Sequence, residues 1–195
     1  MELKLNQKRT YLVGLAFMSI ILFWTIYDTL IAKMLVDNFG LNQTWSGVVM
    51  ALDNVLALFM LPLFGRLSDK TKTKLGKRTP YIIVGTIIAA ILFVGVAFFD
   101  LYQQMAVTQY GFGPITDVGN EGNPIYQYTF DGEEIKHTAN TGVKSYLASD
   151  RAAHIFSVVT KNNPGLLIGF IVVLFFVLLA MGVYRSPAVS LMPDV

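Results

Sequence analysis

The sequence contains no cysteine and few charged residues. Its 195 residues are 14% charged and 54% apolar, with a mean hydropathy of +0.54, whereas a soluble domain has about 25% charged residues. So little charge cannot cover a soluble globule of this size, and the composition therefore indicates a membrane protein. The absence of cysteine excludes a disulfide framework, a cysteine-ligated zinc site and a thiol nucleophile. A net charge of +2 is too small to indicate a nucleic-acid partner.

Four apolar segments are long enough to cross a bilayer, which takes about 20 mostly apolar residues in a helix. They span residues 11–36, 44–64, 80–99 and 165–184. The first is too long for the apolar region of a signal peptide, and no Ala-x-Ala cleavage pattern follows it. We therefore predict an all-α membrane protein in which the first segment is an uncleaved span and the lipid bilayer is a partner.

Basic residues are concentrated on one side of these spans. Ten of the 15 lysines and arginines lie before the first span, between the second and third, or after the fourth: Lys4, Lys8, Arg9, Arg66, Lys70, Lys72, Lys74, Lys77, Arg78 and Arg185. The positive-inside rule places these segments in the cytoplasm. We predict a multi-pass protein of the plasma (cell inner) membrane with both chain ends cytoplasmic.

The segment between the third and fourth spans is about 65 residues long and is predicted to lie outside the cell. Residues 125–130 alternate weakly, Asp131-Gly132 is a hairpin signal, and residues 145–159 have helical spacing. These features predict an external subdomain of a hairpin and a helix. The expected organisation is residues 1–99 with three spans and the cytoplasmic loop 65–80, residues 100–164 with the external subdomain, and residues 165–195 with the fourth span and cytoplasmic end of an incomplete domain.

Neither a metal centre nor an enzyme active site is indicated by the remaining polar residues. The two histidines, His137 and His154, lie in the external segment without a third ligand at metal-like spacing. The spans contain no His–Asp cluster and no Ser–His arrangement. We therefore expect no metal, no cofactor and no catalytic residue. Small residues four positions apart, Gly85 with Ala89 and Gly165 with Gly169, predict close helix packing in lipid.

Two carboxylates, Asp28 and Asp53, stand inside the predicted spans. Each costs about 2.5–3.5 kcal/mol at the centre of a membrane helix, so such residues usually face a bundle interior or a water-filled path and have a function. At a rise of about 1.5 Å per residue both fall near the bilayer midplane, where secondary transporters bind substrate and coupling ion. The structural alternative is that Asp53 and Asn54 together make interhelical hydrogen bonds that only hold the bundle.

Polar and aromatic residues accompany the two acids. Asp28 is preceded by Trp24, Thr25 and Tyr27. A carboxylate accepts protons from sugar hydroxyls, and an aromatic ring covers the apolar face of a sugar. The candidate residues for binding a small-molecule substrate, a sugar or glycoside, and its coupling cation are Trp24, Thr25, Tyr27, Asp28, Asp53 and Asn54.

The cytoplasmic loop carries a motif. It reads Gly65-Arg66-Leu67-Ser68-Asp69-Lys70 and, after five residues, Gly76-Lys77-Arg78-Thr79-Pro80-Tyr81. It resembles the loop between helices two and three of the major facilitator superfamily. The seven-residue interval from Asp69 to Gly76 is similar to that of the glycoside–pentoside–hexuronide:cation symporters and the related sucrose-transporter branch. Gly65 permits close helix approach, and Asp69 can accept from helix amides or from basic side chains.

A second motif follows the fourth span. Arg185-Ser186-Pro187-Ala188 and Leu191-Met192-Pro193-Asp194 resemble the Arg-x-Pro…Leu…Asp segment of the sucrose-transporter-like branch. The resemblance implies secondary active transport by alternating access, with the loop stabilising one face of the cycle. It implies conformational gating by Gly65, Arg66, Asp69, Gly76, Arg78, Arg185 and Asp194.

The coupling ion expected from this resemblance is a proton rather than sodium. Melibiose-type symporters place cation-binding aspartates relative to a Pro-x-x-Gly in helix two, and the corresponding positions here are Ala57 and Leu61. Proton coupling through Asp28 or Asp53 is therefore the preferred interpretation.

A complete superfamily member has twelve spans in two halves. We expect this chain to be the N-terminal portion of such a transporter, without its C-terminal helices. The alternative is a four-span scaffold or interaction protein without transport activity. Tetraspanins have that outline but depend on loop disulfides, which a cysteine-free chain cannot form.

Overall fold

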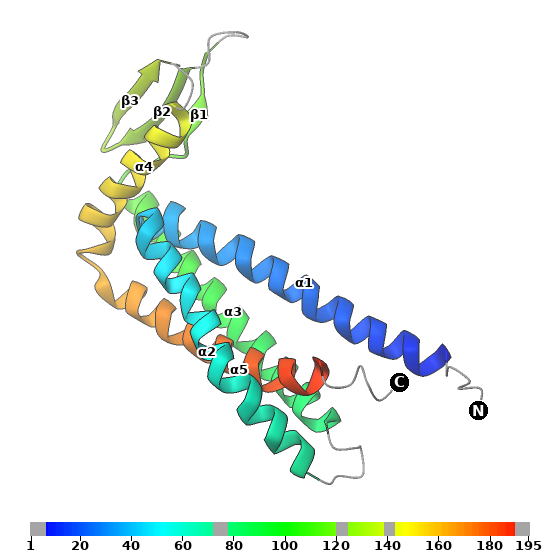
Figure 1. The fold of residues 1–195 in the computed structure, drawn as a ribbon. Coiled ribbons are helices and arrows are strands. Elements are labelled where there is room, and N and C mark those ends of the chain that lie inside the picture. Colours follow the sequence, from blue (N-terminus) through cyan, green and yellow to red (C-terminus); the bar gives the residue numbers. More distant parts are fainter. Residues whose placement is uncertain (1–6, 72–77, 120–124, 139–142, 190–195) are drawn as a thin grey trace. The chain divides into compact units, whose positions relative to one another are not determined.

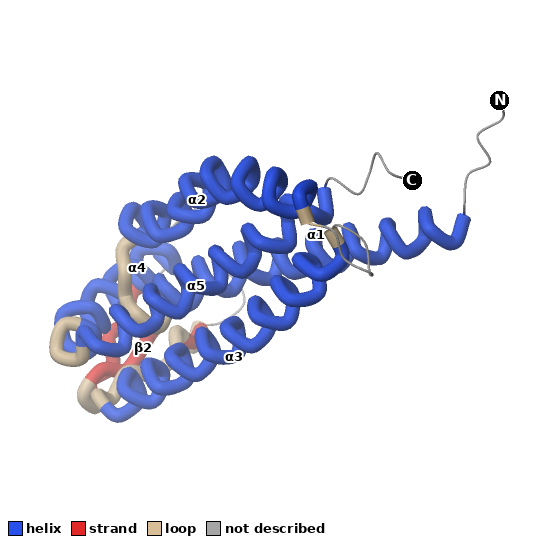
Figure 2. The backbone as a smooth tube through the Cα atoms, turned by 90° about the horizontal axis from the view of Figure 1, so that it is seen from below, coloured by secondary structure: helices blue, strands red, loops and turns tan. Residues whose placement is uncertain are grey.

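The computed structural model describes residues 7–71, 78–119, 125–138 and 143–189. Four long helices make up most of it (Figures 1 and 2). They are α1 (Gln7–Asp37), α2 (Gln43–Lys70), α3 (Thr79–Gln109) and α5 (Pro164–Val189). Each contains one of the four predicted spans.

Three of these helices, α2, α3 and α5, are long and apolar enough to cross a membrane, among the residues that the structure describes. The chain is therefore a multi-pass membrane protein. The helix predicted for the first span is present as α1, and its crossing of the membrane stays a prediction.

Helix α3 extends beyond the third predicted span, which ends at Phe99. Helix α3 continues ten residues past Phe99, to Gln109, because no glycine or proline interrupts residues 100–109. Two buried polar residues in this extension, Asp100 and Gln103, make hydrogen bonds. Asp100 accepts hydrogen bonds from Asn38 and Gln104, and the Gln103 amide donates to the carbonyl of Asn38. The segment predicted as an external loop thus begins as helix.

The chain divides into two compact units. Unit 1 comprises residues 1–30, 50–95 and 172–195, and unit 2 comprises residues 31–49 and 96–171. Each of the four long helices therefore contributes residues to both units. The ends of the long helices group with residues 110–163, and the predicted organisation into residues 1–99, 100–164 and 165–195 stays a prediction.

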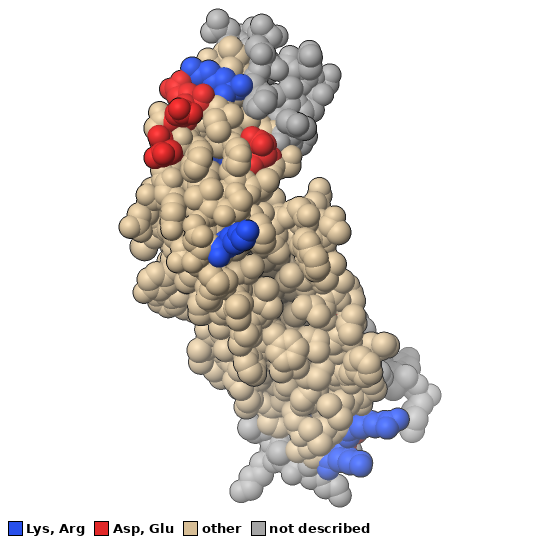
Figure 3. Space-filling model, turned by 90° about the vertical axis from the view of Figure 1, so that its left-hand side faces the viewer, with Lys and Arg blue, Asp and Glu red and all other residues tan. Residues whose placement is uncertain are grey.

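Unit 2 contains the predicted hairpin. Strands β2 (Ile125–Phe130) and β3 (Glu133–Thr138) pair antiparallel with Phe130 opposite Glu133, and β1 (Thr116–Asp117) adds a short third strand to β2. The turn is Asp131-Gly132, both with positive φ, as a two-residue hairpin turn requires. Acidic and basic side chains lie next to one another at this hairpin (Figure 3).

The predicted helix of the external subdomain is also present. It consists of α4 (Val143–Ile155) and a π-helical turn, η1 (Phe156–Thr160). Tyr128, Leu147 and Ile155 belong to the core of unit 2, and Val107 from the extension of α3 joins them. The external segment therefore folds around its own apolar core.

In unit 1, α5 contacts both α2 and α3, and Figure 2 shows it between them. A Cβ added to Gly85 would lie 2.9 Å from the Cβ of Tyr184, and one added to Gly182 would lie 3.0 Å from the Cβ of Met60. The close approach predicted at Gly85 is confirmed. At the second predicted pair, Gly169 lies against the ring of Phe99, whereas a Cβ added to Gly165 would have no described atom outside its own helix within 4 Å.

Candidate functional site

A small pocket in unit 1 surrounds Asp53, and we call it the Asp53 pocket. Side chains from α1, α2 and α5 form it. The described residues that line it are Trp24, Asp53, Leu56, Ala57, Met60, Leu61, Leu178, Met181, Gly182 and Arg185. Its cavity volume is about 10 Å³, which is close to the least that holds one water molecule. In this conformation the pocket admits a water but not a sugar.

Arg185 is the cation of the Asp53 pocket. Its guanidinium lies over the ring of Trp24, 4.5 Å from the ring centroid, in the geometry of a cation–π contact. Arg185 and Asp53 line the same pocket. The pocket thus combines a buried carboxylate and a guanidinium.

Two buried donors beside these charges lack partners. The Tyr27 hydroxyl and the Trp24 indole N–H have no hydrogen-bond partner among the described residues. Tyr27 is fully buried, and its ring packs edge-on against Trp24 with centroids 5.8 Å apart. Because a buried polar group without a partner is costly, these donors are suited to meet an acceptor that enters from outside.

The structure brings together some of the residues predicted to bind substrate and cation, but not all. Asp53 is buried and Trp24 lines its pocket. Thr25, Asp28 and Asn54 have exposed side chains and are not among the described lining residues. The Thr25 hydroxyl instead donates to the carbonyl of Ile21, one turn back in its own helix.

Sequence reasoning assigned Arg185 to gating and missed its place beside Asp53. The available signal was an arginine next to Tyr184 at the end of an otherwise apolar helix. The contact with Trp24 joins residues 161 positions apart and left no local pattern.

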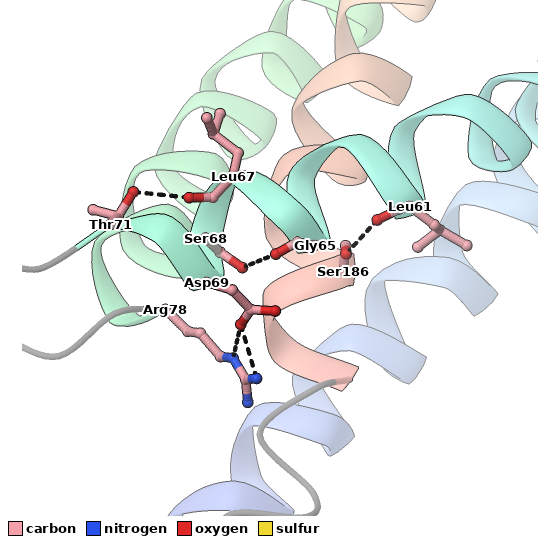
Figure 4. A network of polar contacts seen from close by, with 8 residues as sticks. All are labelled: Leu61, Gly65, Leu67, Ser68, Asp69, Thr71, Arg78 and Ser186. Carbon is pink, nitrogen blue, oxygen red and sulfur yellow. Dashed lines mark hydrogen bonds and ion pairs between the residues drawn. The ribbon is translucent and has the colours of Figure 1, made fainter.

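A second polar cluster, which we call the α2–α3 latch, joins the end of α2 to the start of α3 (Figure 4). Arg78 donates to Asp69 Oδ1 from Nη2 at 3.0 Å and from Nε at 3.3 Å. The hydroxyls of Thr71 and Tyr81 are 2.8 Å apart and share a hydrogen bond. Asp69 and Arg78, two of the predicted gating residues, are therefore paired.

Helix α5 is tied to α2 close to this latch. The Ser186 hydroxyl donates to the carbonyl of Leu61 at 2.7 Å (Figure 4). A Cβ added to Gly65 would lie 3.1 Å from the Ser186 oxygen, so Gly65 permits the close approach predicted for it. Arg66 is exposed on α2, and the predicted gating residues Gly76 and Asp194 lie outside the described residues.

Unit 2 contains a separate polar network around Tyr128. The buried Tyr128 hydroxyl donates to Asp150 at 3.0 Å and lies 2.9 Å from His154 Nδ1. Because a hydroxyl has one proton, His154 Nδ1 is the donor in the second bond. Burial, and then the hydrogen bond to the Asp150 carboxylate, raise the pKa of Tyr128. The side chain of His137 lies outside the described residues, so the expectation of no metal stays a prediction.

Arg151 connects three segments of unit 2. It donates from Nε to the carbonyl of Gly113 at 2.9 Å and from Nη1 to the carbonyl of Asp37 at 3.1 Å. Burial lowers the pKa of Arg151. These bonds attach α4 to the end of α1 and to the segment after α3.

The sequence is similar to a known protein family and to a known permease. Residues 12–116, more than half of the chain, match the family described as MFS/sugar transport protein. A lactose permease of Lactobacillus helveticus is 38% identical over 76 residues, which are 33% of this chain and 12% of the permease. The chain thus covers a small part of that relative's length. No solved structure matches the chain.

Proposed function

Since the chain belongs to the MFS/sugar transport protein family, we propose that it is the N-terminal portion of a sugar:cation symporter that works by alternating access. The lactose permease relative makes a galactoside the first substrate to test. A carrier of this superfamily has twelve spans, so the partners of this chain are the C-terminal helices of the transporter and the lipid bilayer. The predicted location is the plasma membrane with cytoplasmic ends.

The observation that carries this proposal is the Asp53 pocket. It contains a buried carboxylate and a guanidinium, and it is lined by Trp24, whose indole N–H has no described partner. The ring of Tyr27, whose hydroxyl also has no described partner, packs against Trp24. A sugar hydroxyl both donates and accepts hydrogen bonds. A bound sugar could therefore donate to the carboxylate and accept from an unpaired N–H or O–H. Because the pocket holds about one water molecule, the sugar enters only after α1, α2 and α5 separate locally.

The proton is the better candidate for the coupling ion. Ala57 and Leu61 occupy the places where melibiose-type symporters carry cation-binding aspartates, and both line the Asp53 pocket as apolar side chains. A sodium ion prefers several oxygen ligands, whereas a single buried carboxylate beside an arginine can bind and release one proton. Asp28 is the second acid of this proposal, and its side chain is exposed on α1.

The gating role proposed for the latch residues follows from their position. The ion pair of Asp69 and Arg78 links two helices, and Ser186 links a third to them. Such links hold one arrangement of the helix ends and must break or shift when that end opens. The four-span scaffold is the less favoured alternative, because it gives no reason for a buried Asp53 or for this latch.

The proposed function is tested by uptake in cells that express the gene in full and lack other sugar uptake. We expect radiolabelled lactose to accumulate at acidic external pH, and a protonophore to abolish the accumulation. Replacing sodium by choline should leave it unchanged. Loss of accumulation in choline would show sodium coupling, and accumulation of none of a panel of galactosides, glucosides and uronides would contradict sugar transport.

A further inference from the structure

An apolar groove runs along α2 and ends beside two basic side chains. Its described lining residues are Phe59, Pro62, Leu63, Arg66, Leu67 and Lys70, and its volume is about 530 Å³. Ligand sites commonly have volumes of about 300–1,000 Å³. All six residues lie on one face of the helix, since they recur at intervals of three and four positions. We call this surface the α2 groove.

The α2 groove faces away from the helix that packs on α2. Leu61 and Gly65 contact Ser186 of α5, and both lie on the opposite side of α2 at about 100° per residue. The side chains of Phe59 and Leu63 are 66% and 57% exposed. In a helix that crosses a membrane, a face of this kind is open to lipid or to another helix.

Two basic residues stand at one end of the groove. Arg66 and Lys70 are both exposed. The neighbouring acid on α2 is Asp69, whose Oδ1 already accepts two hydrogen bonds from Arg78. Figure 3 shows lysine and arginine side chains at this end of unit 1, and no acidic side chain is visible beside them on that face.

We propose that the α2 groove binds an anionic phospholipid, with an acyl chain against Phe59, Leu63 and Leu67 and the phosphate between Arg66 and Lys70. Long basic side chains at a helix end reach toward the membrane surface, and a guanidinium binds phosphate through paired hydrogen bonds. Charge complementarity selects a headgroup with net negative charge, because the choline of a zwitterionic lipid would be repelled by two adjacent cations. The proposal depends on the membrane location of α2 and not on sugar transport.

The test uses the purified chain in nanodiscs of phosphatidylcholine that contain spin-labelled phosphatidylglycerol or spin-labelled phosphatidylcholine. Electron paramagnetic resonance then gives the motionally restricted fraction of each lipid. The chain should restrict phosphatidylglycerol preferentially. Removing both charges with R66Q/K70Q should lower that preference by up to about 30-fold, from the attraction of each basic residue to an anionic lipid surface.

Two matched variants separate a site from a general charge effect. K33Q/K161Q also removes two positive charges from exposed positions, but in unit 2, and it should leave the preference unchanged. R66K/K70R keeps both charges and should retain most of the preference, which also controls for folding.

Three results would overturn the proposal. One is a wild-type chain that restricts both lipids equally. Another is an equal loss of preference in R66Q/K70Q and K33Q/K161Q. The third is the finding that a second copy of the chain packs against the α2 groove. Because the chain has no cysteine, a single Leu63→Cys variant reports it by disulfide cross-linking between chains.

Discussion

At the scale of single residues, the buried aromatic donors of this protein are of two kinds. Tyr128 is buried and its hydroxyl has two partners, Asp150 and His154. Tyr27 is also buried, but its hydroxyl has no partner among the described residues, and the same holds for the indole N–H of Trp24. The first arrangement stabilises a fold, and the second is the one that we propose for ligand binding.

Replacing Tyr128 by Phe should destabilise the external subdomain by about 1–3 kcal/mol, because Asp150 and His154 each lose a buried partner. The raised pKa of Tyr128 adds a pH dependence. The folded chain holds this proton more tightly than the unfolded chain, so the stabilisation is complete below the ordinary tyrosine value of about 10 and is lost as pH rises above it. Hydrogen exchange of residues 125–138 at neutral pH measures the first effect.

The alkaline effect is measured by the near-ultraviolet absorbance of tyrosinate together with thermal unfolding. Wild type should lose stability above about pH 10 more steeply than Tyr128→Phe. The matched control is Tyr110→Phe, since Tyr110 is 38% exposed. Equal alkaline loss in wild type and in Tyr128→Phe would show that Tyr128 does not carry the effect.

The sequence indicated single residues of the candidate site, but not which of them contact one another. Asp53 was recognisable because a carboxylate inside an apolar membrane helix is energetically costly and therefore indicates a function. Its neighbour Arg185 was recognisable as a motif residue only, since the contact with Trp24 depends on how α1 and α5 pack. For Asn54 the sequence predicted a place in the site that the structure does not show. Successive residues of a helix point about 100° apart, so Asn54 is exposed although its neighbour Asp53 is buried.

At the scale of elements, helices were predictable and their ends were not. Long apolar runs indicated all four long helices, and an Asp-Gly pair indicated the hairpin turn. The extension of α3 to Gln109 left no apolar run, because it is stabilised by contacts of Asp100 and Gln103 with residues more than 50 positions away. The length of an apolar run predicts the part of a helix that contacts lipid. It does not predict how far the helix continues into a folded subdomain.

The α2–α3 latch is the element-scale feature with a functional test. In the full transporter, Asp69→Asn should slow lactose uptake by about 1.4-fold to fivefold with little change in apparent affinity, since a partly exposed ion pair contributes about 0.2–1 kcal/mol. Arg78→Gln should have a similar effect. The exchanged pair D69R/R78D should recover part of the rate, measured as initial uptake at saturating sugar.

Recovery by the exchanged pair is the informative comparison. It keeps opposite charges across the two helices while changing both side chains. An exchanged pair that transports no better than the single variants would show that Asp69 acts through another partner, and the gating role of the pair would be contradicted.

At the scale of the whole molecule, two compact units share four helices. Unit 1 contains the Asp53 pocket, the α2–α3 latch and the α2 groove, so the features proposed for transport and lipid binding belong to one unit. Unit 2 contains the external subdomain with its own core. The family match covers residues 12–116 and therefore includes Trp24, Asp53 and the latch, whereas Arg185 lies beyond it.

The central claim is that Asp53 couples a proton to sugar transport, and counterflow compared with accumulation tests it most directly. Asp53→Asn in the full transporter should retain lactose counterflow, which needs no proton gradient, and lose accumulation driven by acidic external pH. Asp131→Asn makes the same chemical change in the exposed hairpin turn, at a position with positive φ that asparagine tolerates, and should leave both activities unchanged. An Asp53→Asn transporter that accumulates lactose at acidic pH as well as wild type would contradict the claim.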